Sequence, residues 1–180
     1  NLQLELLEHY PIRDVAIGLN EPSGLALNRS GSKLYTVSDD TKAIFNLNLQ
    51  GKFIANSSFR VELNDLEGLA LTSDDNEIIV VQESSNSVVR FDIVNRKEIR
   101  RTPLSAMKNY DQIANHFRND DLDKGLEGIT INFSNDHVFV IKEGKPGLLI
   151  ELDSECKTIL NYCVLNKKCG FKHPRIKPKK

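Results

Sequence analysis

The hexapeptide Ser23-Gly-Leu-Ala-Leu-Asn28 has two later counterparts in the chain, and this recurrence decides the fold. Glu67-Gly-Leu-Ala-Leu-Thr72 stands 44 residues further on, and Glu127-Gly-Ile-Thr-Ile-Asn132 stands 60 residues beyond that. Self-similarity at intervals of this size is typical of repeat architectures, in which each copy is one supersecondary unit. Each hexapeptide is a short run of small and apolar residues, so we predict that it forms a strand.

Three further short stretches of residues follow each hexapeptide, at equivalent positions in the three copies. The second run is rich in β-branched and aromatic residues, which favours a strand buried on both faces, and covers 34–37, 78–81 and 138–141. The third run alternates between apolar and polar residues and covers 44–49, 88–93 and 149–153. The last run is short and charged, at 52–54, 97–99 and 157–159. Each copy therefore predicts four antiparallel strands.

Four-stranded units that open with a small, glycine-containing strand are typical of the blades of a β-propeller, where inner strands crowd at the axis. We therefore predict an all-β fold, with blades over 23–54, 67–99 and 127–160 in a domain that covers 1–165. A β-sandwich is the alternative all-β arrangement, but it does not explain the matching offsets.

Three blades do not close a ring, because propellers typically have four to eight. The chain is thus expected to be an incomplete propeller: a fragment, a truncated reading frame, or a subunit that completes itself by self-association through its open blade faces. The abrupt change to a basic tail after Leu165 favours truncation. Residues 2–13 can supply one more strand for a last blade. Between the second and third copies, five residues recur at helical spacing: Met107, Tyr110, Ile113, Ala114 and Phe117. We therefore expect a short amphipathic helix over 105–118 that packs on the propeller.

Composition limits the classes of function. The chain has 180 residues, 39% apolar and 27% charged, and contains no apolar run of the roughly 18 residues that span a bilayer. The formal net charge is −1, but residues 166–180 form a basic tail that we expect to be disordered. The rest of the chain is acidic and should repel nucleic acid. Neither a G-x-S-x-G nor an H-E-x-x-H motif is present, so nucleophilic and zincin-type catalysis have no support.

Several short motifs recur in the order and spacing of a known family. They are the three inner-strand openings at 22–27, 66–71 and 125–130, together with Tyr35-Thr-Val-Ser-Asp-Asp40 and Val140-Ile-Lys-Glu143. Over about 6–160 the chain resembles the SdiA-regulated family of bacterial propellers. Similar inner-strand motifs occur in the gluconolactonase and regucalcin family and in esterase-like phytases. The resemblance implies a cell-envelope protein, periplasmic or anchored through a segment outside this sequence, and a bound calcium ion. It implies no established reaction.

Two columns of the repeat hold carboxylates. The first column, just before the inner strand, reads Ser23, Glu67, Glu127, and the second, 16 residues on, reads Asp39, Glu83, Glu143. The start of one antiparallel strand and the end of the next lie at the same edge, so we expect these acids at one end of the propeller.

Such a cluster suits a hard cation. Like charges raise each other's pKa unless a cation neutralises them, and an oxygen-rich set favours Ca²⁺ or Mg²⁺. The gluconolactonase resemblance also implies that a Glu at this position ligates a metal. We therefore predict a calcium site at Glu67, Glu127, Glu83, Glu143 and Asp39. In the alternative interpretation, these acids cap backbone N–H groups and bind nothing.

Two functions remain open at this point. One is a non-enzymatic, calcium-stabilised propeller that binds an unidentified protein or small-molecule ligand. The other is a metal-dependent hydrolase of the lactonase or phosphoesterase type, in which the ion polarises a carbonyl or phosphoryl oxygen and one acid is the general base.

Overall fold

The computed structural model describes residues 3–38, 40–117 and 124–165, which form three four-stranded antiparallel sheets in sequence order. Blade 1 contains β1 (Pro22–Leu27), β2 (Leu34–Ser38), β3 (Thr41–Leu47) and β4 (Phe59–Arg60). Blade 2 contains β5 (Leu66–Leu71), β6 (Glu77–Gln82), β7 (Ser87–Asp92) and β8 (Lys97–Pro103). Blade 3 contains β9 (Leu126–Asn132), β10 (His137–Lys142), β11 (Gly147–Leu152) and β12 (Ile159–Leu165). The predicted all-β class is confirmed.

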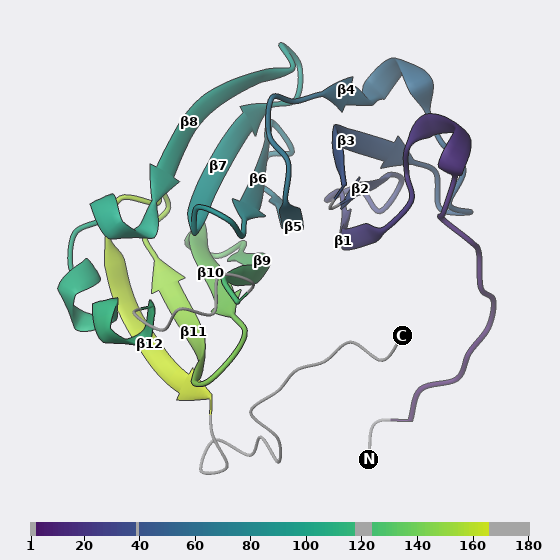
Figure 1. Cartoon of the computed structure of the whole chain (residues 1–180). Helices are drawn as coiled ribbons and strands as arrows, with labels where there is room; N and C mark the ends of the chain where they lie inside the picture. The colour runs from purple at the N-terminus through teal and green to yellow at the C-terminus, as the bar shows by residue number, and fades with distance from the viewer. Residues whose placement is uncertain (1–2, 39, 118–123, 166–180) are drawn as a thin grey trace.

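The blades stand side by side around a common axis, with β1, β5 and β9 innermost (Figure 1). Glycine permits the close approach of these inner strands. A Cβ atom on Gly68 would lie 2.9 Å from the Cα of Gly128, and one on Gly24 would lie 3.0 Å from the Cα of Gly68. The glycines of the first two hexapeptides are therefore required by backbone-to-backbone contact at the axis, whereas a Cβ on Gly128 would meet the Ile141 side chain of its own blade at 2.9 Å.

Apolar side chains fill the space between successive blades. One cluster joins Tyr35, Val37 and Ile44 of blade 1 to the face of blade 2 that carries Leu69 and Val80. A second cluster joins the opposite face of blade 2 to blade 3, and its members include Ile79, Val81, Val88, Val138, Val140 and Ile150. Blade 2 is thus apolar on both faces, as expected of a sheet covered on both sides.

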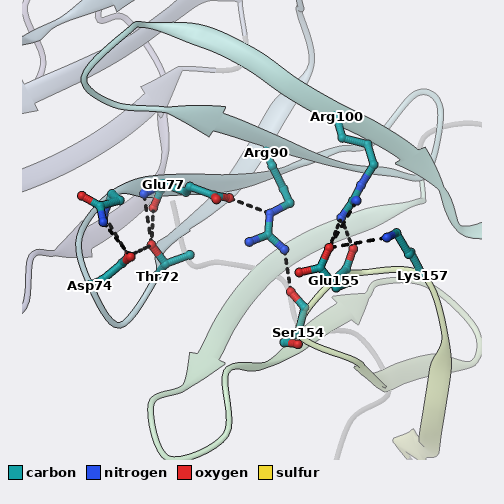
Figure 2. Close-up of polar contacts among 9 residues, drawn as sticks. Thr72, Asp74, Glu77, Arg90, Arg100, Ser154, Glu155 and Lys157 are labelled. Carbon is teal, nitrogen blue, oxygen red and sulfur yellow. Dashed lines mark hydrogen bonds and ion pairs between the residues drawn. The ribbon is translucent and has the colours of Figure 1, made fainter.

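Polar contacts at the outer part of the sheets also tie blade 2 to blade 3 (Figure 2). The Arg90 Nε donates to Glu77 at 2.7 Å within blade 2, and the Arg90 Nη1 donates to the Ser154 carbonyl of blade 3 at 2.5 Å. Next to it, Arg100 donates to the carbonyl of Glu155 and lies 3.4 Å from the carboxylate of that residue. Two arginines of blade 2 therefore donate hydrogen bonds to carbonyl groups in one turn of blade 3.

Two outer strands differ from the prediction. In blade 1, residues 52–54 contribute only an isolated bridge between Phe53 and Leu47, and the outer strand is β4. The 3₁₀ helix Ala55–Ser57 separates the two, and the backbone N–H of Asn46 donates to the Ser58 hydroxyl instead of to a strand. In blade 3 the turn after β11 includes Cys156 in the left-handed region, so β12 begins at Ile159 and not at 157.

The insertion between blades 2 and 3 is not one amphipathic helix. Its described residues form three 3₁₀ helices, Leu104–Ala106, Tyr110–Gln112 and Ala114–Phe117, while Arg118 lies outside the described residues. Asn109 has a left-handed φ of 68°, which interrupts any continuous helix. The backbone of Lys108 instead pairs with blade 3, accepting from Ile159 at 3.0 Å. Met107 and Ile113 are nevertheless buried in the core, as their spacing predicted.

The described residues that precede blade 1 contribute little to the sheets. Residues 3–13 form no strand of the kind expected for a last blade, and the 3₁₀ helix Val15–Ile17 leads into blade 1. The predicted basic tail at 166–180 lies outside the described residues. Within the described ranges, the helices are too short to cross a membrane.

Candidate functional site

A β-bulge at the start of each inner strand positions the first column of the repeat. In β5, Leu66 and Gly68 pair with consecutive residues of β6, so Glu67 is the extra residue of the bulge between them. The same irregularity leaves Glu127 unpaired in β9 and Ser23 unpaired in β1. A bulge bends the strand and re-aims the extra side chain. One residue of each blade is therefore freed from the ladder at the same end of the molecule.

The second column is held against the first by backbone hydrogen bonds. The N–H of Glu83, just after β6, donates to the Asp65 carbonyl at 3.1 Å, and the N–H of Glu143, just after β10, donates to the Gly125 carbonyl at 3.1 Å. These two bonds are equivalent contacts in blades 2 and 3. Because each ties the residue after the second strand to the residue before the bulge, the two acidic columns meet within each blade.

Blades 2 and 3 are joined at this point by Gly125. Its N–H donates to the Glu83 carboxylate at 2.8 Å, and a Cβ at this position would lie 2.7 Å from the Glu83 carbonyl. Only glycine lets the chain entering blade 3 approach so closely. Glu83 is thereby placed between the acids of its own blade and those of the next.

Five carboxylates converge as a result. One oxygen from each of Asp65, Glu67 and Glu83 lies within 4.8 Å of the others, and the same holds for Glu83, Glu127 and Glu143. Glu83 belongs to both groups, so we name the five residues the carboxylate cluster. All five are partly buried.

The cluster retains a proton at neutral pH. Burial, followed by the charges of Glu83, Glu67 and Glu143, raises the pKa of Glu127 to about 8. Burial also raises the pKa of Glu83, although the Gly125 N–H and a hydrogen bond from the Glu127 carboxyl oppose this increase. Glu127 is therefore the protonated carboxyl group and donates a hydrogen bond to the Glu83 carboxylate.

Two lysines lie at the blade 3 side of the cluster. The Lys124 Nζ is 3.3 Å from the Glu143 carboxylate, which offsets one negative charge. Lys142 is buried, donates to the Glu143 carbonyl at 2.7 Å and stands 5.5 Å from the centre of the Phe117 ring. Glu143 thus has a cationic partner beside it.

Blade 1 supplies no member of either carboxylate group within the described residues. Ser23 occupies the bulge but donates to the neighbouring Glu21 carbonyl at 3.1 Å. Hydrogen bonds, first from Asn20 and then from Ser38, lower the pKa of Asp40. The predicted ligand Asp39 lies outside the described residues.

The sequence prediction and the structure agree on most of the cluster's membership. The structure brings Glu67, Glu83, Glu127 and Glu143 together, as the two columns predicted. It adds Asp65, which the sequence reasoning missed. The sequence does contain a sign of Asp65, because the first copy of the repeat also has an acid, Glu21, at the equivalent position. The third copy has Gly125 there, so the acid does not recur in all three copies.

Comparison with known proteins identifies the family. The SdiA-regulated family matches residues 7–168, which is nearly the whole described chain. The chain belongs to the SdiA-regulated family. No curated protein matches its sequence significantly.

Solved structures agree with the SdiA-regulated propeller in fold. Hydrazine synthase of Kuenenia stuttgartiensis is similar with a TM-score of 0.58 at 13% identity over 82% of this chain. The β-propeller domain of Cps50 (Swd1) from Myceliophteria thermophila is similar with a TM-score of 0.55 at 18% identity over 81% of this chain. The chain spans only 38% and 42% of those two proteins. At this identity the likeness concerns the fold alone.

Proposed function

We propose that this SdiA-regulated propeller is a non-enzymatic, calcium-binding module that presents a surface to a protein or small-molecule ligand in the cell envelope. The carboxylate cluster is the observation that carries the cation part of this proposal. The family resemblance is what supports the envelope location.

The donor set fits a hard divalent cation. Asp65, Glu67, Glu83, Glu127 and Glu143 offer carboxylate oxygens from two adjacent blades, and Ca²⁺ takes six to eight oxygen ligands at about 2.3–2.6 Å. Without a cation the acids repel one another and hold a proton in a partly buried place, which costs stability. A bound cation would remove this repulsion and would join blade 2 to blade 3 at the axis.

Thermal unfolding with calcium or chelator tests the proposal. A ligand that binds only the folded state stabilises it by about 2.7 kcal/mol at 100 times its Kd, which is roughly 5–10 °C in Tm for a chain of this size. Glu67→Gln keeps the shape of the side chain and removes one charge, so it should reduce the calcium response and leave the fold intact. Glu62→Gln removes a charge from an exposed residue outside the cluster and is the matched control.

Proton release provides a second readout. Because the pKa of Glu127 is about 8, calcium binding at pH 7 should expel up to one proton. Calorimetry in two buffers of different ionisation enthalpy measures this number. If calcium changes neither the Tm nor the proton count, or acts equally on the wild type and Glu67→Gln, the acids are structural caps.

The protonation of Glu127 favours one second candidate, a metal-dependent hydrolase of the lactonase or phosphoesterase type. A carboxyl group with a pKa of about 8 is near the range of a general acid or base at neutral pH. A panel of lactones, aryl esters and phosphoesters, assayed with Ca²⁺, Mg²⁺, Mn²⁺ and Zn²⁺, separates the two functions. Metal-dependent turnover that Glu127→Gln abolishes would replace the binding-module proposal with this one.

A further inference from the structure

The last residue of the second strand is buried and polar in all three blades. It is Ser38 in blade 1, Gln82 in blade 2 and Lys142 in blade 3. In blade 1 the hydroxyl of Ser38 accepts from the Glu21 N–H at 3.2 Å. In blade 2 the side chain of Gln82 donates to the Asn64 carbonyl at 3.1 Å. An uncharged side chain at this position thus bonds to the segment ahead of the inner strand, and blade 3 places a charged one there.

The ammonium group of Lys142 lies between the carboxylate cluster and the insertion. Its Nζ donates to the Glu143 carbonyl at 2.7 Å and stands 5.5 Å from the centre of the Phe117 ring. A Cβ on Gly144 would lie 3.4 Å from this Nζ and 3.0 Å from the Lys124 Cδ, so the two lysines are neighbours across the glycine. Lys142 is only 6% exposed, so solvent screens its charge less than that of a surface lysine.

The two lysines act in opposite ways on the two states of the cluster. Without a cation, five carboxyl groups lie together with one of them protonated, and the charges of Lys124 and Lys142 offset part of the remaining repulsion. When a divalent cation occupies the cluster, the same ammonium groups repel it. Each lysine therefore stabilises the cation-free cluster relative to the cation-bound one.

We propose that Lys142 is a built-in counterion of the carboxylate cluster and sets its affinity for divalent cations. This inference rests on the proposed cation-binding function and deepens it, because the site then binds a cation more weakly than its acids alone would. Lys124 has the same sign of effect, but its side chain is 31% exposed and more strongly screened. Lys142 is held from both sides, by the Glu143 carbonyl and by the Phe117 ring, and so keeps its place when a cation binds.

Lys142→Gln is the test variant, because it gives blade 3 the uncharged residue that blade 2 has at Gln82. Calorimetric titration with Ca²⁺ at fixed pH and ionic strength should show about 10-fold tighter binding than in the wild type, since a repelling charge is removed. Lys142→Arg keeps the charge and should bind Ca²⁺ as the wild type does. Lys97→Gln removes an exposed lysine of the outer strand β8 and should have no effect. Lys142→Met, which keeps most of the side-chain length, replaces Lys142→Gln if that variant does not fold.

The charge of the probe ion separates repulsion from a change in the shape of the site. Tb³⁺ carries three positive charges and, like Ca²⁺, is a hard cation that takes oxygen ligands. Repulsion by Lys142 grows in proportion to the charge of the ion, so Lys142→Gln should tighten Tb³⁺ binding by about 30-fold where it tightens Ca²⁺ binding by about 10-fold. A variant that only shifted the Glu143 backbone would not rank the two ions by charge.

Stability in chelator gives a readout that needs no bound ion. Lys142→Gln should lower the Tm, because it removes a charge that offsets repulsion among the acids. The loss should be smaller when Glu67→Gln has already removed one of those acids, which a double-mutant cycle measures. Phe117→Leu removes the ring beside the ammonium and keeps the charge. It should lower the Tm equally with and without Glu67→Gln and leave the Ca²⁺ affinity close to that of the wild type.

The outcomes distinguish this inference from the proposed function on which it rests. If the wild type binds Ca²⁺ and folded Lys142→Gln binds it no more tightly, the cation site stands, Lys142 only braces the fold and the counterion role is wrong. If neither protein binds Ca²⁺ at millimolar concentrations, the proposed function fails and this inference fails with it. Binding by Lys142→Gln alone would support both. Circular dichroism of each variant establishes that it is folded before it is titrated.

Discussion

Replacement of Glu127 by Gln tests the electrostatics of the carboxylate cluster most directly. In the absence of a cation, the folded protein raises the pKa of Glu127 from 4.5 to about 8. Between these two pH values the folded state binds a proton that the unfolded state has released. Stability must therefore fall as the pH rises from about 4.5 to about 8, and it should level off above that. Gln imitates the protonated carboxyl group at every pH, so Glu127→Gln should lack this decline.

The expected difference in stability follows from the pKa shift of Glu127 and from the exposure of its side chain to solvent. One pKa unit corresponds to about 1.36 kcal/mol, so an unscreened shift of this size would be worth about 5 kcal/mol. Glu127 is only partly buried and shares its proton with Glu83, so solvent screening reduces the expected difference to about 1–2 kcal/mol. For a chain of this size that difference corresponds to roughly 2–8 °C in Tm.

The assay is urea or thermal unfolding with chelator at pH 5 and pH 8.5 and at a fixed protein concentration. Wild type and Glu127→Gln should be similar at pH 5, and the variant should be the more stable protein at pH 8.5. Added calcium should reverse that order by stabilising the wild type alone. Glu62→Gln should follow the wild type throughout. Parallel pH profiles for wild type and Glu127→Gln would refute the shared proton in the cluster.

Three other predictions concern the scaffold. Gly68→Ala should destabilise the fold by about 1–3 kcal/mol in urea unfolding, because its Cβ would lie 2.9 Å from the Gly128 Cα; Gly147→Ala, whose nearest neighbour would be at 3.4 Å, should have little effect. Arg90→Ala should cost about 1–3 kcal/mol, because it removes contacts to Glu77 and Ser154, whereas Arg101→Ala breaks an exposed pair and should cost less than about 1 kcal/mol. Burial raises the pKa of Cys156 to about 11, so alkylation followed by mass spectrometry at pH 8 should modify it at least about 100-fold more slowly than the exposed Cys163.

The repeat predicted the blades because each blade is specified locally. Offsets of the hexapeptide located every inner strand, and two-sided apolar runs located β2, β6 and β10. The outer strands were predicted less well, since they are short, charged and lie at a sheet edge. In blade 1 the backbone N–H of Asn46 donates to the Ser58 hydroxyl and not to an outer strand. The pattern of apolar residues does not indicate this contact.

The insertion shows how a periodicity can indicate burial and still mislead about helix type. Leu104, Met107, Tyr110 and Ile113 are spaced by three residues, which matches the three residues per turn of a 3₁₀ helix as well as the face of an α-helix. Runs of 3₁₀ helix are short, and the left-handed Asn109 divides this one. Burial of Met107 and Ile113 was therefore predictable, but the broken path was not.

The carboxylate cluster was predicted from the two columns of equivalent positions in the repeat. The prediction was therefore correct for the acids of blades 2 and 3 that lie in those columns. Glu67, Glu83, Glu127 and Glu143 occupy positions that recur in blades 2 and 3, and antiparallel geometry places such positions at one edge. Asp65 enters the cluster through a left-handed conformation with a φ of 62°, and the sequence gives no direct sign of that conformation. The Asp39 ligand and the calcium ion stay predictions.

The bulge explains how a repeated scaffold acquires a site that is not repeated. In every blade it frees one side chain from the ladder, while the glycine that follows in blades 1 and 2 lets the backbone of the next blade approach closely. The fold therefore tolerates different residues at the freed position, and that residue contributes to the local charge together with Asp65, Glu83 and Glu143. Ser23 donates to the Glu21 carbonyl within its own segment and adds no acid at blade 1, whereas Glu67 and Glu127 each lie near Glu83 in the carboxylate cluster. Repulsion between these acids opposes the apolar packing of the same two blades, so a cation bound there would strengthen the interface that the cluster weakens.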